Sequence, residues 1–386
     1  MDEKGSVIRW RDGVVTAVRR QWPGAVELDV TTSGGDACRA LAYPALTGQP
    51  GPGDRVLLNT TALALGLGTG GYAFVVAIPD RLPADDPPGA GHLVKARYTP
   101  LQATVLGVDE QDSPHHDLLR DADDLGGMPV VVADLHSALP AVLAATRAVR
   151  PAATVTPPSA DAPPPEDTSP SAVAPPRAVY VMQDGGALPV WFSRTCAGLR
   201  EAGWLAGTIS VGQAFGGDLE AVTLHTGLLA ARHVLGADLA VVTQGPGNLG
   251  TGTRWGFSGV ASGEAVNAAA VLNGRPVASL RVSEADARER HRGVSHHSLT
   301  AYGRVALARA DVVVPDLPGE FGARVTEQAA ALGPRHDLVR VPLDGLLEAL
   351  RACPVPLSTM GRGLDQDLAY FLAAAAAGRH ALSLLA

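Results

Sequence analysis

The first part of the chain alternates short apolar segments with residues that form turns. The apolar runs VVTAV, AVELDV, CRALAY, DRVLLN and YAFVVAI are separated by segments rich in Gly, Pro and Asp, such as TSGGD and GQPGPGD. Short strands with frequent turn signals are typical of small barrels built from antiparallel strands. We therefore expect residues 1–80 to form a small antiparallel β-barrel.

From residue 92 onward the pattern changes to continuous apolar runs, most of them separated by segments long enough to form helices. These runs are QATVLGV, PVVVADL, AVYVM, GTISV, LAVVT, PVASLRV, DVVVP and DLVRVP. Strands that are apolar on both faces and alternate with helices indicate a mostly parallel sheet with helices on both faces. The predicted fold class is therefore α/β, preceded by the small barrel.

Two segments interrupt these patterns. Residues 81–91 contain consecutive Pro and Gly, which favour neither helix nor strand, so we expect a hinge there. Residues 151–176 are rich in Pro and Ala and have few large apolar side chains, which predicts a disordered linker. The α/β domain is then expected to have a first part, residues 92–150, and a main part, residues 177–386.

Composition and charge narrow the class of protein. The formal net charge of −8 counts against a general nucleic-acid surface. No run approaches the roughly 18 apolar residues of a membrane span, and the first residues lack the apolar core of a signal peptide. We expect a cytoplasmic protein with no membrane partner. The composition leaves a homo-oligomer open.

The run TQGPGNLGTGTRWGFSG, which begins at the end of the predicted strand LAVVT, is the strongest sign of a binding site. It has six glycines between Gly245 and Gly259, a density that costs conformational entropy on folding. Glycine amides at the carboxyl edge of a parallel sheet can donate hydrogen bonds to an anion, whereas the structural alternative is a wide crossover loop. The expected ligand-binding positions are Gly245, Gly247, Asn248, Gly250, Thr251, Gly252, Thr253 and Arg254.

The next informative run, RVSEADARERHRGVSHHSLT, is locally basic. Five Arg stand against three acidic residues between Arg281 and Arg304, the reverse of the overall charge balance. We expect an anion to be bound by Arg281, Arg288, Arg292 and Ser295, with a catalytic acid or base among His291, His296 and His297. Two alternatives stay open, a structural polar network and a metal site in which Asp184, Asp218 or Asp286 adds an oxygen ligand.

Two acidic residues stand at predicted strand ends, where open α/β sheets hold ligands. Asp184 precedes two glycines and is expected to be either a turn residue or a catalytic acid or ligand. Asp218 is expected to cap a helix that carries Glu220 and His225, and it is also a candidate ligand-binding residue.

Four motifs, MQDGGALP, GQAFGGDLEA, GPGNLGTGTRWGFSG and RHRGVSHHSLT, together resemble an uncharacterised bacterial family, the domain of unknown function numbered 3866. The resemblance spans nearly the whole chain. It implies kinship and brings with it no activity, cofactor or site residue.

The function that the residues favour is the binding of a small anionic molecule, such as a nucleotide or a phosphorylated or carboxylated metabolite. No motif identifies a cofactor. One alternative is a metal-assisted hydrolase that uses the Asp and His residues named above. The other is a non-catalytic regulatory or interaction protein in which the barrel binds a partner.

Overall fold

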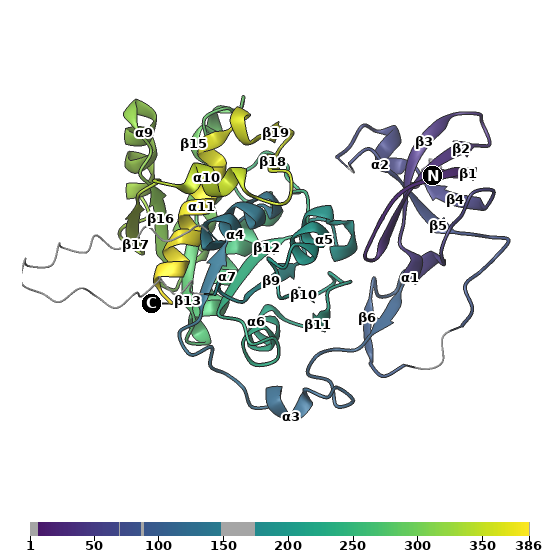
Figure 1. The fold of residues 1–386 in the computed structure, drawn as a ribbon, viewed down its shortest axis with the longest axis horizontal. Helices are drawn as coiled ribbons and strands as arrows, with labels where there is room; N and C mark the ends of the chain where they lie inside the picture. Colours follow the sequence, from purple (N-terminus) through teal and green to yellow (C-terminus); the bar gives the residue numbers. More distant parts are fainter. Residues whose placement is uncertain (1–6, 69, 86–88, 148–173, 386) are drawn as a thin grey trace, which may run out of the picture.

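The structure, a computed structural model, describes residues 7–68, 70–85, 89–147 and 174–385. Figure 1 shows a small barrel at one end of the molecule and a larger α/β body at the other. The predicted linker lies outside the described residues except for 174–176. Within the described residues, no helix is both long enough and apolar enough to cross a bilayer.

All five strands predicted for the barrel are present. They are β1 (Trp10–Trp22), β2 (Ala25–Thr32), β3 (Ala37–Ala42), β4 (Arg55–Asn59) and β5 (Ala73–Ala77), closed in the order β1-β2-β3-β5-β4. The barrel is mixed and not wholly antiparallel as expected, because β3 and β5 run parallel. A crossover that contains α1 (Pro44–Thr47), β4 and α2 (Thr61–Ala64) joins them, and only such a long connection can link parallel strands.

The α/β body contains one sheet of eight parallel strands, which confirms the predicted fold class. In spatial order they are β11 (Leu219–Ala221), β10 (Gly207–Val211), β9 (Ala178–Gln183), β12 (Leu239–Gln244), β8 (Pro129–Val132), β13 (Arg275–Ser279), β16 (Asp311–Pro315) and β17 (Asp337–Val341). Central strands are buried along their whole length, which explains their continuous apolar sequences.

Helices cover both faces of this sheet, and successive strand residues point to opposite faces. Val130 and Val132 of β8 belong to one apolar cluster, whereas Val131 belongs to the other. The first cluster is covered by α6 (Leu224–His233), α7 (Ala261–Val271) and α9 (Gly319–Ala330), and the second by α4 (Leu139–Arg147), α5 (Arg194–Glu201), α10 (Leu346–Arg351) and α11 (Leu368–Ser383). Small side chains allow these layers to approach closely.

The remaining elements are short. They comprise the strand pairs β6 (Leu93–Lys95) with β7 (Ala103–Val105), β14 (Val282–Ser283) with β15 (Gly293–Val294) and β18 (Ser358–Thr359) with β19 (Arg362–Gly363), the helices α3 (His116–Leu119) and α8 (His296–Thr300), and the turns η1 (His136–Ala138), η2 (Val190–Phe192), η3 (Ser258–Val260), η4 (Glu289–His291), η5 (Ala301–Val305) and η6 (Leu364–Gln366).

Two local predictions are wrong. The run QATVLGV forms no full strand of the main sheet, because its strand β7 pairs with β6, and only Gly107 near its end makes a single parallel bridge to Glu220 of β11. Asp218 caps no helix, since Glu220 lies in strand β11 and α6 begins three residues after that strand. The cap of α6 is Thr223, whose hydroxyl oxygen accepts a hydrogen bond from the backbone N–H of Thr226.

The barrel packs against the α/β body around Trp191. The indole N–H of Trp22 donates to the backbone oxygen of Trp191 over 2.7 Å, and the Tyr43 and Trp191 ring centroids are 6.0 Å apart. A Cβ atom at Gly24 would come within 2.1 Å of the Trp191 ring. The barrel hairpin and this ring are therefore in direct contact.

The strand order reverses at the centre of the sheet. The chain runs outward from β9 to β11, returns through β12 between β9 and β8, and continues through β13 on the other side of β8. Loops that leave the carboxyl ends of neighbouring strands diverge at such a reversal and leave a crevice for ligands. The loops after β8, β12 and β13 meet at this edge.

Candidate functional site

Two cavities lie in the crevice and share the side chains of Asn248 and Met360. The smaller has a volume of about 120 Å³ and the larger about 670 Å³. The smaller is lined by Asn248, Gly250, Gly252, Thr253, Gly256, Arg281, Arg288, Arg290, His291, His296, His297 and Met360. None of these residues is acidic. We call this the polar cavity, and it brings together nine of the residues that the sequence analysis selected.

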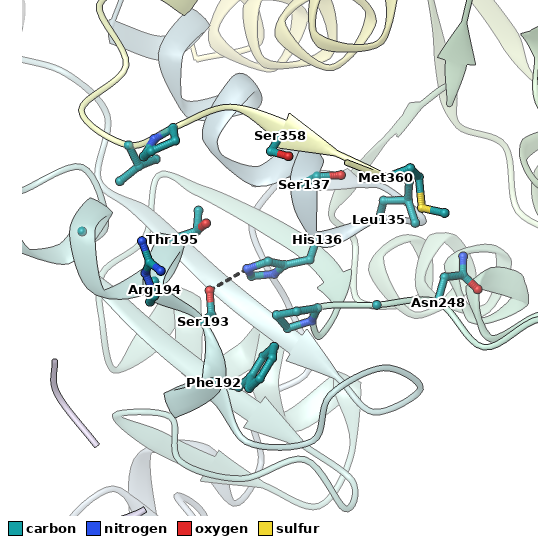
Figure 2. A pocket seen from close by; sticks show the side chains of 15 residues that line it. Leu135, His136, Ser137, Phe192, Ser193, Arg194, Thr195, Asn248, Ser358 and Met360 are labelled. Carbon is teal, nitrogen blue, oxygen red and sulfur yellow. Dashed lines mark hydrogen bonds between the residues drawn. The ribbon is translucent and has the colours of Figure 1, made fainter. Parts of the chain in front are cut away.

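The larger cavity contains a pair of polar side chains, His136 and Ser193. Figure 2 shows His136 facing Ser193, with His136 Nε2 2.7 Å from the Ser193 hydroxyl oxygen. His136 Nδ1 lies 2.9 Å from the Tyr180 hydroxyl. Burial lowers the pKa of His136 to about 4, so its imidazole is neutral at pH 7. The lining also includes the apolar side chains Leu135, Phe192, Val355 and Met360.

The Gly-rich loop that follows β12 folds back on itself and does not start a helix. The Thr251 N–H donates to the Gly256 oxygen over 2.7 Å, and the Ser258 N–H donates to the Leu249 oxygen over 2.9 Å. The amides of Gly250 and Gly252, both at the polar cavity, donate no hydrogen bond within the described residues. They are therefore available to an anion.

Three glycines of the loop differ in what their positions require. Gly252 has a φ of +83°, which other residues rarely adopt. Gly250 has no positive φ, and a Cβ atom there would lie 3.8 Å from the Gly256 oxygen, an ordinary contact, so the fold leaves room for a side chain. Gly245 is a packing residue, because a Cβ atom there would come within 2.0 Å of the Ala187 oxygen.

Three histidines converge on the opposite wall of the polar cavity. Ser295 begins the short helix α8, and its hydroxyl is 2.7 Å from His291 Nδ1. The His291, His296 and His297 ring centroids are 4.5–4.9 Å apart. Their potential ligand nitrogens all lie within 4.8 Å of one another. His296 and His297 point differently, as adjacent residues must, but the turn at Ser295 brings the His291 ring within 4.9 Å of both.

A buried carboxylate, which the sequence analysis did not select, lies behind this cluster. Asp134 follows β8, and its Oδ2 is 3.4 Å from His297 Nδ1 and 3.6 Å from Arg281 Nη1. Burial alone would raise the pKa of Asp134, but His297 and Arg281 outweigh burial and lower it below its usual range. Phe257 stacks on the His297 ring at 3.7 Å between centroids and so holds its orientation.

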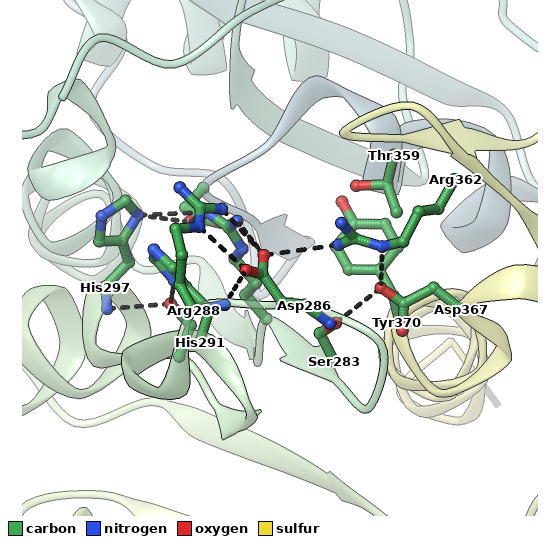
Figure 3. A network of polar contacts seen from close by, with 12 residues as sticks. Ser283, Asp286, Arg288, His291, His297, Thr359, Arg362, Asp367 and Tyr370 are labelled. Carbon is green, nitrogen blue, oxygen red and sulfur yellow. Dashed lines mark hydrogen bonds and ion pairs between the residues drawn. The ribbon is translucent and has the colours of Figure 1, made fainter.

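Acidic residues already compensate most of the arginine charge around the cavity. Figure 3 shows Asp286 between Arg288 and Arg362, with Arg362 also paired to Asp367. Arg288 donates to both Asp286 oxygens over 2.9 and 2.8 Å and holds the pKa of that carboxyl well below its usual range. Arg290 makes no ion pair or hydrogen bond through its side chain within the described residues, so its charge is free for a ligand.

Two of the imidazoles that face the cavity, those of His291 and His296, are neutral at pH 7. Burial, assisted by Arg281 and Arg288, lowers the pKa of His291 to about 3. Burial, assisted by His297 and Arg290, lowers the pKa of His296 to about 4. The Nε2 atom of His296 is buried and has no hydrogen-bond partner within the described residues. An unpaired buried nitrogen is costly, which points to a missing partner.

A model of the family described as protein of unknown function (DUF3866) matches residues 39–378. The chain belongs to the DUF3866 family. This confirms the resemblance carried by the four motifs, and the match runs from strand β3 of the barrel into helix α11. No curated protein and no solved structure matches the chain.

Several predicted residues of this DUF3866 chain lie away from the polar cavity. Asp184 is exposed and accepts a hydrogen bond from the Gln213 N–H over 3.0 Å. Asp218 pairs with Arg200 and accepts from Thr208. The others are Arg292, exposed outside the cavity, Thr251 and Arg254, exposed in the loop, Gly247, which lines the larger cavity, and Ser295, which is buried behind His291.

Some residues at the DUF3866 site were missed although the sequence carries a signal for them. Asp134 and His136 directly follow the apolar run PVVVA, where an open α/β sheet presents its loops. Arg290 stands between Arg288, which pairs with Asp286, and Arg292, which lies outside the cavity. Met360 carries no such signal, because it reaches the cavity from a distant turn that the folding of the chain brings close.

Proposed function

We propose that the DUF3866 chain binds a small organic anion, with its charged group in the polar cavity and its body in the larger cavity. The observation that carries this proposal is that the two cavities are neighbours, with Asn248 and Met360 in the walls of both. A site that held an inorganic ion alone would need no neighbouring space of this size.

The polar cavity supplies donors for the charged group. Arg290 has no acidic partner within the described residues, and the amides of Gly250 and Gly252 are unused. Hydrogen bonds to an anion from an ionised guanidinium are roughly twice as strong as neutral ones. A cavity of about 120 Å³ holds a phosphate or carboxylate group and little more.

The larger cavity selects the body of the ligand. Its volume of about 670 Å³ lies in the range typical of small-molecule sites, roughly 300–1,000 Å³. Apolar side chains such as Phe192 and Val355 alternate with polar ones such as His136 and Ser193. This lining suits a body that has both apolar and hydrogen-bonding groups, as in nucleotides and in phosphorylated or carboxylated metabolites.

The test compares two arginines that are two residues apart. Thermal shift with phosphorylated and carboxylated metabolites, adenosine monophosphate among them, selects a ligand whose affinity is then measured by calorimetry. Arg290→Gln should weaken binding at least tenfold, about 1.4 kcal/mol, because it removes the uncompensated cation. Arg292→Gln is the matched control, since Arg292 is exposed and lies outside the cavity. Equal losses in both variants, or no binding by any metabolite, would refute the proposal.

A further inference from the structure

The three histidines differ from an ordinary buried polar network in how their ring nitrogens are occupied. His291 Nδ1 is engaged by the Ser295 hydroxyl, and His297 Nδ1 lies 3.4 Å from Asp134 Oδ2 and 3.3 Å from Arg281 Nη1. Each ring therefore keeps its Nε2 atom for another partner. His296 Nε2 is buried and has no hydrogen-bond partner within the described residues.

Contacts of this kind orient metal-binding imidazoles in proteins. A histidine that binds a metal through one nitrogen usually donates the other N–H to a carboxylate, a carbonyl oxygen or another polar group, which fixes the tautomer. Asp134 is in the right place to do this for His297, and Ser295 for His291. Stacking of Phe257 on His297 restricts the ring further.

We propose that His291, His296 and His297 bind a divalent transition-metal ion of the zinc class. Imidazole nitrogen suits zinc, copper, nickel and cobalt and is a poor ligand for magnesium or calcium. Three protein ligands leave a fourth position open, the arrangement that distinguishes reactive zinc sites from closed structural ones. That position faces the polar cavity.

The distances require a modest adjustment. In a tetrahedral zinc site with Zn–N bonds of roughly 2.0–2.1 Å, the ligand nitrogens lie about 3.3 Å apart. The three ligand nitrogens here already lie within 4.8 Å of one another. His296 is only partly buried, so its side chain can rotate toward the other two histidines when the ion binds.

The positive charge of the nearby arginines repels a metal cation less than their number suggests, because acidic residues compensate part of it. Asp286 compensates Arg288, and Asp134 lies beside Arg281. An anion in the polar cavity would add negative charge next to the metal, but the metal site does not depend on that anion.

The test is metal binding by the full chain without any added organic anion. After removal of metal by a chelator, calorimetric titration with Zn²⁺ should show one tight site per chain. His296→Asn should weaken that site at least 100-fold. The matched control is His225→Asn, because His225 is exposed and its side chain makes no hydrogen bond, ion pair or ring contact within the described residues. Circular dichroism checks that both variants are folded.

A measurement on the unmodified chain covers the case in which His296→Asn does not fold. Binding of Co²⁺ should produce the visible absorption of a nitrogen-coordinated, low-symmetry ion at one equivalent, and Zn²⁺ should displace it. No such absorption, or equal Zn²⁺ affinity in the original chain and folded His296→Asn, would overturn the proposal. If the chain bound no organic anion, the results of these metal titrations would be the same, because they are made without any organic anion.

Discussion

His136 should make folding stability depend on pH, and His136→Gln should remove that dependence. The ring is buried between the Tyr180 and Ser193 hydroxyls, where Gln retains hydrogen-bonding capacity but does not titrate. Burial lowers the pKa of His136 from its ordinary 6.5 to about 4. Between these values the unfolded chain binds a proton that the folded chain excludes, so acid favours unfolding.

The magnitude follows from this difference. The contribution of neutral His136 to stability is complete above pH 6.5 and is lost as the pH falls toward about 4. Each pK unit corresponds to about 1.4 kcal/mol, so lowering the pH from about 7 to about 5 should cost roughly 2 kcal/mol through this residue.

Urea unfolding at these two pH values measures the effect. Other titrating groups change stability in both proteins, so the relevant quantity is the loss in the original chain minus the loss in His136→Gln. A control, His225→Gln, should lose as much as the original chain, because this exposed side chain is in water both before and after unfolding. If His136→Gln lost the same free energy as the original chain, the burial argument for His136 would be wrong.

Two further predictions concern the polar cavity. Gly252→Val should abolish binding of the organic anion, because it adds a side chain beside an unused amide. The control Gly53→Val, at a similar φ of +90° in the distant barrel, should lower the melting temperature by a comparable amount but leave the affinity for the anion unchanged. Equal affinities in the two variants would exclude a role for the loop. Asp286→Asn should lower the free energy of urea unfolding by about 1.5–3 kcal/mol, because it removes the buried carboxylate that accepts two hydrogen bonds from Arg288. The exposed pair lost in Asp117→Asn should cost less than about 1 kcal/mol, and a similar loss in both variants would contradict this distinction.

The sequence by itself determined the fold class and most of the strands. A continuous apolar run buries all of its side chains only as a strand that is covered on both faces. The runs from AVYVM to DLVRVP all form strands of the eight-stranded sheet. It did not determine the parallel pairing of β3 with β5, because pairing depends on how the intervening crossover packs. Nor did it place QATVLGV, whose strand is held by a hairpin that buried Lys95 anchors to the Gly212 and Ala214 oxygens.

The sequence also determined the main composition of the polar cavity, because the Gly-rich loop and the Arg/His run are each dense in donors over a short span. Only the tertiary structure decided which members face each other. The strand reversal brings Asp134 behind His297, although 163 positions separate them, and local spacing carries no information about such a contact. The same packing excludes Asp184 and Asp218 from the cavity and divides the arginines between paired and free charge. A free Arg290 beside a paired Arg288 is a consequence of where Asp286 lies in space.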